Sequence, residues 1–110
     1  MLIDKPTLLR SDKEEYDQNV DGLPVLFWNF VEIPDSYILR IENYFDQIHF
    51  VRRFQVIDYF NDQTLDLNDT EKVPDFPEFS PGFYQWRIDN IGPDEDNSGA
   101  ESNWQVFEIK

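Results

Sequence analysis

Two segments of the chain alternate between apolar and polar side chains, and this pattern restricts the possible fold more than any other feature. In Ser36–Asn43 and in Phe83–Ile91, large apolar residues stand at every second position. Successive side chains of a β-strand point to opposite faces, so a two-residue period predicts strands with one buried face. With their neighbours in other predicted strands, these residues define a predicted core of Trp28, Tyr37, Leu39, Ile41, Tyr84, Trp86, Ile88, Phe107 and Ile109.

Five further segments are predicted to be strands because they are rich in aromatic, β-branched or alternating apolar residues. The segment Ile48–Phe60 is interrupted by two arginines, so it is either two strands with a bend or one strand with a bulge, and a helix is the competing interpretation. The five segments are Asp4–Leu9, Leu23–Phe30, Ile48–Phe60, Thr64–Asp69 and Asn103–Lys110.

The segments between these strands predict loops rather than helices. Three prolines exclude Glu71–Gly82 from a helix interior or a central strand. Arg10–Gly22 and Gly92–Asn103 are polar and acidic, and no segment has a long amphipathic helical period. We therefore predict an all-β, antiparallel two-sheet sandwich of about seven strands, forming a single domain over residues 1–110.

The charge of the chain limits its possible partners. It carries 23 acidic and 9 basic residues, a net charge of -14 at pH 7. Nucleic-acid binders need a basic face, so no nucleic-acid ligand is expected, and adsorption to anionic membranes is disfavoured. A cationic partner or bound cations remain compatible with this charge.

The N-terminal segment shows neither a signal peptide nor an apolar run long enough to span a membrane. The chain contains no cysteine, so disulfide bonds give no indication of its cellular compartment. The chain is therefore either cytoplasmic or a piece of a longer exported protein, and we expect a monomer without membrane insertion.

Three motifs occur in an order that resembles the immunoglobulin-like sandwiches of fibronectin type III-like domains in bacterial surface proteins. They are PVLFWNF, which contains Trp28, then SYILRIEN, and finally FSPGFYQWRID followed by NWQVFEI. The resemblance implies that Tyr84 is a tyrosine-corner residue, that Phe79 is the apolar residue before the turn, and that Trp104 belongs to the last strand. Phe83 departs from the family, which tends to have a small threonine there, and the segment between Asp46 and Phe76 is unusually long.

The resemblance also implies a function, namely a non-catalytic spacer or a protein- or glycan-recognition module of a larger exported or cell-surface protein. The acidic loops Arg10–Gly22 and Gly92–Asn103 are the predicted contact surfaces. The alternative is a stand-alone acidic inhibitor that mimics nucleic acid and occupies a basic groove of its partner.

Few residues offer chemistry of their own. Asp94, Asp96 and Asn97 are candidate calcium ligands, because Ca²⁺ takes six to eight oxygen ligands from a loop that can curl around it. A solvated acidic loop is the competing interpretation, and no other cofactor is expected. His49, the only histidine, is predicted to be an ordinary strand or surface residue, so no catalytic constellation is present and the chain is not expected to be an enzyme.

The aromatic and basic residues are also assigned structural roles. The three tryptophans are predicted to pack in the core rather than to form a sugar platform, whereas Tyr16 and Phe83 are better candidates for exposure. We predict that the arginines of the sheet strands pair with carboxylates on neighbouring strands. These are Arg40, Arg52, Arg53 and Arg87.

Overall fold

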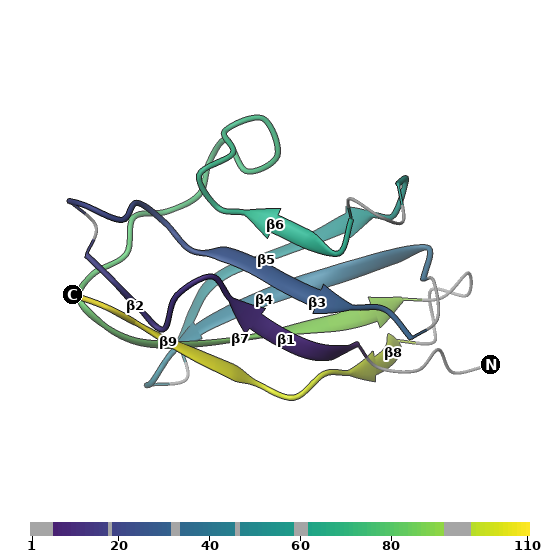
Figure 1. Ribbon diagram of the computed structural model, residues 1–110. Coiled ribbons are helices and arrows are strands. Elements are labelled where there is room, and N and C mark those ends of the chain that lie inside the picture. The colour runs from purple at the N-terminus through teal and green to yellow at the C-terminus, as the bar shows by residue number, and fades with distance from the viewer. Residues whose placement is uncertain (1–5, 18, 32–33, 46, 59–61, 92–97) are drawn as a thin grey trace.

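The computed structural model describes residues 6–17, 19–31, 34–45, 47–58, 62–91 and 98–110, with only the backbone at 98–101. Within these ranges every regular element is a β-strand, and the strands form two sheets, so the predicted all-β, two-sheet class is confirmed (Figure 1). The nine strands are β1 (Thr7–Ser11), β2 (Glu15–Tyr16), β3 (Val25–Asn29), β4 (Ser36–Asn43), β5 (Ile48–Gln55), β6 (Thr64–Asp66), β7 (Gly82–Ile91), β8 (Ser98–Glu101) and β9 (Gln105–Ile109).

The small sheet has the strand order β1-β3-β6, and both of its pairings are antiparallel. Its central strand β3 buries Leu26 and Trp28, while the residues between and beside them are only partly buried or exposed. Leu65 of β6 lies opposite Leu26 and is also buried. The alternation along β3 therefore gives this sheet one apolar face.

The large sheet has the strand order β2-β9-β7-β4-β5, and β8 also pairs with β7. The antiparallel pair of β4 and β7 forms its centre, where Leu39 lies opposite Ile88 and Ile41 lies opposite Trp86. All four side chains are fully buried on the inner face. The short strand β2 pairs in parallel with the end of β9.

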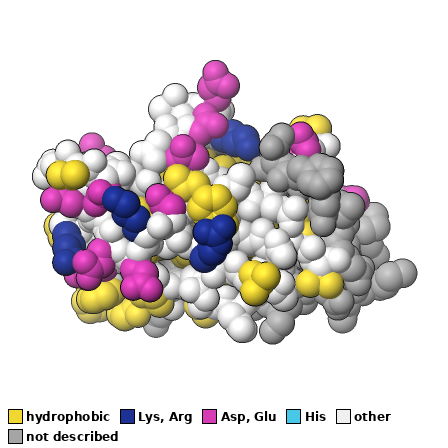
Figure 2. Space-filling view, viewed as in Figure 1, with side chains coloured by type: hydrophobic (Ala, Val, Ile, Leu, Met, Phe, Trp, Pro, Cys, Tyr) yellow, Lys and Arg dark blue, Asp and Glu magenta, His cyan; other side chains and the backbone are white. Residues whose placement is uncertain are grey.

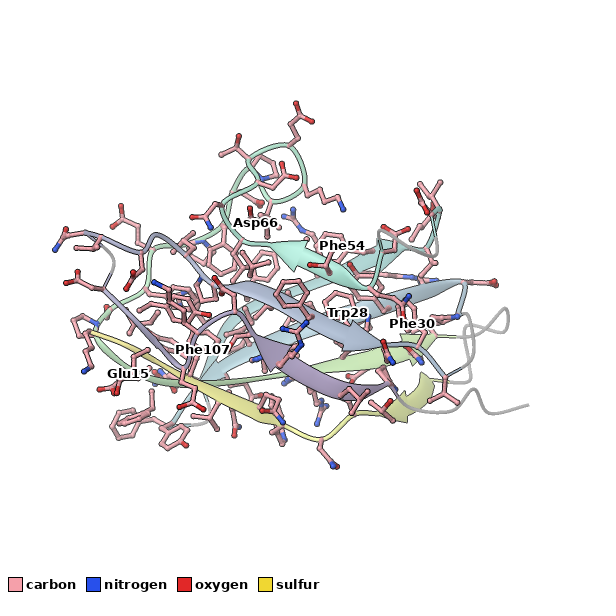
Figure 3. The ribbon with its side chains drawn as sticks, in the orientation of Figure 1. Glu15, Trp28, Phe30, Phe54, Asp66 and Phe107 are labelled. Carbon is pink, nitrogen blue, oxygen red and sulfur yellow. The ribbon has the colours of Figure 1, made fainter. Side chains whose placement is uncertain are left out.

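The core lies between the two sheets, and all nine residues predicted for it are buried there. Trp28 connects the sheets, since its ring centroid lies 5.0 Å from that of Tyr37 and 6.3 Å from that of Trp86, both in edge-on geometry. In Figure 3, Trp28 and Phe30 lie where the small sheet overlaps the large one. Such edge-on aromatic pairs add to the stabilisation that burial provides.

The connection from β6 to β7 contains no strand over residues 67–81. The prolines predicted this from Glu71 onward, whereas the strand predicted at Thr64–Asp69 was too long, because β6 ends at Asp66. The connection is nevertheless packed, because Val73 and Phe79 are buried in the core. At its end the Tyr84 hydroxyl donates a hydrogen bond to the Ser80 carbonyl at 2.9 Å and accepts one from the Ser80 amide at 3.2 Å.

Several predicted boundaries were wrong. The first strand is Thr7–Ser11 rather than Asp4–Leu9, of which residues 4 and 5 lie outside the described ranges. The segment Arg10–Gly22 is not wholly a loop, because it contains the end of β1 and all of β2. Tyr16 anchors β2 to the rest of the protein, because its side chain is buried in the core.

Two further segments differ from or refine the prediction. Gly92–Asn103 was predicted to be a loop, but Ser98–Glu101 forms β8 against β7. Ile48–Phe60 contains the single strand β5, and a register shift between Ile41 and Glu42 marks a bulge. One strand with a bulge is therefore what the described part of this segment forms, but the bulge lies at His49 and not at Arg52 and Arg53, which pair in regular register with β4.

Candidate functional site

The predicted calcium ligands Asp94, Asp96 and Asn97 lie outside the described residues. Within the described ranges, no three His, Asp or Glu side chains gather closely enough to hold a metal ion. In the described part of the chain, the candidate site therefore rests on features other than metal ligands.

The predicted contact segment Arg10–Gly22 uses much of its charge internally. The Lys13 ammonium pairs with the Asp21 carboxylate, and the Asp17 amide donates to the same carboxylate at 3.0 Å. The hydrogen bond from Lys13 holds the pKa of Asp21 below its usual range. These contacts order the turn before β3 and leave less of its charge for a partner.

A groove lined by aromatic side chains opens where β4 ends and β7 begins. Tyr44 and Phe83 stack with ring centroids 5.5 Å apart and an angle of 27° between the rings. Both remain well exposed, at 55% and 48%, and Phe45 beside them is 85% exposed. We call this the aromatic groove; its volume is about 610 Å³. Its lining residues are Asn43, Tyr44, Phe45, Ser80, Pro81, Gly82, Phe83 and Tyr84.

The β4–β5 turn explains why two aromatic side chains face water. The Asn43 carboxamide oxygen accepts hydrogen bonds from the amides of Phe45 and Gln47, at 2.9 and 3.0 Å. The backbone amide of Asn43 in turn donates a hydrogen bond to the backbone carbonyl of Gln47 at 2.9 Å. This closed turn holds Tyr44 and Phe45 outside the sandwich, while the alternation of β7 places Phe83 on the outer face of the sheet.

A second depression adjoins the groove, because Phe83 lines both. We call it the acidic cleft; its volume is about 360 Å³. Glu15 of β2 lies opposite Glu108 of β9 in their parallel pairing, and Lys110 binds Glu15 at 2.9 Å. Figure 2 shows hydrophobic side chains gathered beside acidic ones at this end of the molecule. The cleft is lined by Arg10, Ser11, Glu14, Glu15, Phe83, Gln105, Val106, Phe107 and Glu108.

Two of the sheet arginines bind a carboxylate of their own strand, a pairing that the prediction of cross-strand pairs did not include. Arg40 binds Glu42 at 2.7 Å and Arg87 binds Asp89 at 3.0 Å, and the partners in each pair are two residues apart. Residues two apart share one face of a strand, so long side chains can meet without crossing to a neighbour. The hydrogen bond from Arg40 lowers the pKa of Glu42.

The other two arginines contact the β6–β7 connection and strand β4. Arg52 binds Asp75 in the β6–β7 connection with contacts of 2.6 and 2.7 Å. Arg53 does reach the neighbouring strand, but there it donates to the Ser36 hydroxyl at 2.9 Å. Arg52 therefore ties the irregular connection to the edge strand β5.

The predicted burial of two aromatic side chains, Tyr16 and Trp104, was wrong. Tyr16, expected to be exposed, is fully buried, and its hydroxyl donates to Asp12 at 2.6 Å. Burial disfavours the phenolate and raises the pKa of Tyr16 to about 12. Trp104 is half-buried just before β9 and lies outside the core, with the Arg87 guanidinium 4.6 Å from its ring centroid. The exposure expected for Phe83 is confirmed.

His49 has a more specific environment than a plain strand residue. It is the extra residue of the bulge in β5, since Ile41 pairs with Phe50 and Glu42 pairs with Ile48. Its ring stacks on Phe79, with centroids 4.5 Å apart and an angle of 9° between the rings. Burial lowers the pKa of His49 because it disfavours the imidazolium.

Tyr44 and Phe45 were not among the residues predicted to have a functional role. A usable signal exists, because these two aromatic residues stand in a short polar turn between two predicted strands. Large aromatic side chains are uncommon in such turns, which favour Gly, Pro, Asn, Asp and Ser. Their presence in this turn therefore points to a role outside the core.

Comparisons with protein-family models, characterised proteins and solved structures found no match to the chain. In the described part of the chain, no helix has the length and apolar character needed to cross a membrane.

Proposed function

We propose that the chain is an immunoglobulin-like sandwich of fibronectin type III-like topology, and that it serves as a non-catalytic recognition module of a larger exported or cell-surface protein. Its ligand binds in the aromatic groove. The strand order supports the topology, because β1, β3 and β6 can be matched to strands A, B and E of that fold. In the other sheet β4, β7 and β9 match C, F and G, and β5 takes the place of C′.

The contact between Tyr84 and Ser80 gives further support to this assignment. Tyr84 stands near the start of β7, the strand matched to F, and its hydroxyl bonds the backbone four residues upstream. A tyrosine in this position with this hydrogen bond is characteristic of the tyrosine corner in immunoglobulin-like folds.

The exposed stack of Tyr44 and Phe83 is the observation that carries the recognition function. Together with Phe45, it leaves three neighbouring aromatic side chains in contact with water. Contiguous exposed apolar surface is unfavourable in water and commonly marks a binding site. The volume of the groove, about 610 Å³, lies within the range of ligand sites.

The charges of the outer sheet face give less support to a nucleic-acid mimic. Such a protein needs rigid carboxylates that are free to meet a basic groove. Glu42 and Asp89 on this face are instead paired with Arg40 and Arg87 of the same strands.

The experiment is a ligand screen with a matched pair of variants. Labelled protein is applied to a glycan array and to a random 12-residue peptide display library. Binding of the ligands found should fall at least tenfold in Phe45→Ser and remain within twofold in Ile57→Ser. Ile57 is 88% exposed and lies beyond the end of β5, outside the groove lining.

Ligands that bind Phe45→Ser as well as they bind the unmodified protein would contradict the proposal. A screen that yields no ligand at all would also count against it. Thermal melting of both variants verifies the fold, which two exposed substitutions should leave intact.

A further inference from the structure

We infer that the aromatic groove and the acidic cleft form one binding surface for a basic peptide segment of a protein partner. An apolar side chain of the peptide enters the groove, and a neighbouring lysine or arginine lies over Phe83 and faces the cleft. This inference rests on the proposed recognition function and specifies its ligand.

Phe83 and Glu108 bring the two halves of this surface together. They lie directly opposite each other in the antiparallel pairing of β7 and β9. Side chains opposite each other on one face of a sheet have Cβ atoms about 5 Å apart. A cation placed over the exposed Phe83 ring is therefore also beside the Glu108 carboxylate, so a cation–π contact and an ionic contact are available at once.

The charge of the cleft favours a cationic ligand. Three glutamates line it against one arginine, and one of them, Glu15, is paired with Lys110. The guanidinium of that arginine, Arg10, lies 4.4 Å from the ring centroid of Phe27, where it makes a cation–π contact. Beyond the cleft, the net charge of -14 attracts basic segments at long range. The three glutamates are Glu14, Glu15 and Glu108.

The aromatic groove itself favours an apolar side chain over a sugar. The amide and carbonyl of Ser80 both bond the Tyr84 hydroxyl. The carboxamide of Asn43 bonds the turn, including a contact of 3.1 Å from its nitrogen to Gln47. Sugar recognition needs polar groups that can orient hydroxyls, and these groups are already engaged. An aliphatic or aromatic side chain needs only the exposed rings.

The test uses peptides selected from the 12-residue display library, synthesised and titrated against the whole chain. We expect the selected peptides to be enriched in lysine or arginine next to leucine, phenylalanine or another large apolar residue. Glu14→Gln combined with Glu108→Gln should weaken their binding by about five- to tenfold. Raising the salt from about 50 to about 500 mM should weaken it as well.

A charge-matched control removes two carboxylates elsewhere. Asp35→Asn combined with Glu71→Gln makes the same change in net charge, and both residues are exposed and outside the two linings. This variant should change the dissociation constant by less than twofold. A general effect of net charge would instead weaken binding equally in both double variants and would overturn the inference.

The outcomes separate this inference from the proposed function. Neutral or acidic peptides, or glycans, whose binding depends on Phe45 would overturn the basic-peptide ligand and leave the groove as the recognition site. Basic peptides that bind without regard to Phe45 or Glu108 would overturn the composite surface. Absence of any ligand sensitive to Phe45→Ser would remove both proposals.

Discussion

Tyr84 and Ser80 form a closed hydrogen-bonded pair at the point where the irregular β6–β7 connection enters the large sheet. The Tyr84 hydroxyl donates to the Ser80 carbonyl and accepts from the Ser80 amide, at 2.9 and 3.2 Å. Its ring meanwhile packs edge-on against Phe79, with centroids 4.6 Å apart. A single side chain thus satisfies two backbone groups of a connection that has no strand partner of its own.

Replacing Tyr84 with phenylalanine should remove these hydrogen bonds while keeping the ring. We expect the free energy of unfolding to fall by about 1 to 2 kcal/mol, because the amide and carbonyl of Ser80 lose their hydrogen-bond partner at a partly buried position. Urea denaturation followed by circular dichroism measures the change. Tyr44→Phe is the matched control, since Tyr44 is exposed, and an equal loss in both variants would show that the pair with Ser80 is unimportant.

His49 makes stability depend on pH near neutrality. Its folded-state pKa is lowered, chiefly by burial, while the Pro77 carbonyl 3.2 Å from Nε2 opposes the shift. The unfolded chain, with a histidine pKa of about 6.5, then binds the proton more readily than the folded one. The stability contributed by neutral His49 is therefore present above about pH 6.5 and is lost as the pH falls toward the lower folded-state pKa.

The prediction is tested by melting temperatures from about pH 7.5 to about pH 5.5, above the range in which most carboxylates titrate. His49→Gln retains a side-chain donor but cannot titrate. On acidification the unmodified protein should lose stability relative to this variant. Parallel curves for the two proteins would mean that His49 does not titrate differently in the folded state.

Gly22 is required by both its backbone and its neighbour. Its φ of 71° lies in the left-handed region, and an added Cβ would stand 2.9 Å from the Asn68 carboxamide oxygen. That oxygen accepts from the Leu23 amide at 2.8 Å, and the Asn68 nitrogen donates to the Leu23 carbonyl at 2.8 Å. Gly22→Ala should therefore lower the free energy of unfolding by at least about 1 kcal/mol.

A double-mutant cycle separates the two causes. Asn68→Ala removes the close contact together with the two hydrogen bonds, so the combined variant should lose less stability than the sum of the single losses. Strictly additive losses would assign the whole effect of Gly22→Ala to backbone strain.

Leu8 shows the opposite case, a residue whose backbone does not suit its side chain. Its φ is 54°, and it lies where the register of β1 against β3 shifts, with its side chain 74% exposed. Leu8→Gly should raise the free energy of unfolding by up to about 1 kcal/mol, because the left-handed strain disappears and little burial is lost. Leu9→Gly is the control and should destabilise, since Leu9 packs against the core. Destabilisation by Leu8→Gly would indicate that the exposed side chain makes a stabilising contact.

The core could be predicted from the sequence because alternation follows directly from strand geometry. Tyr37, Leu39 and Ile41 repeat every second residue, and their strand pairs along its length with β7, so local pattern and tertiary burial agree. The same reasoning failed for Tyr16, whose burial comes from a two-residue strand paired with the distant β9. No local period can reveal so short an element.

The candidate site was harder to predict from the sequence, because it is formed by contacts between residues that are far apart in the chain. Tyr44 meets Phe83 only because β4 and β7 pair so that Asn43 lies opposite Tyr84. Glu15 meets Glu108 through the parallel pairing of β2 with β9. The sequence predicted that Phe83 is exposed. That Tyr44 stacks on it, or that Glu108 lies opposite Glu15, cannot be inferred without the strand order.

The three tryptophans should report these differences in burial separately. Trp28 and Trp86 are buried, whereas Trp104 is half-buried beneath Arg87. We expect the folded protein to show blue-shifted emission that acrylamide quenches only in part. Trp104→Phe should remove most of the quenchable fraction, while Trp86→Phe should remove mainly the blue-shifted, protected fraction. Quenching that remains unchanged in Trp104→Phe would place water access at Trp28 or Trp86, and it would contradict the packing of those two rings between the sheets.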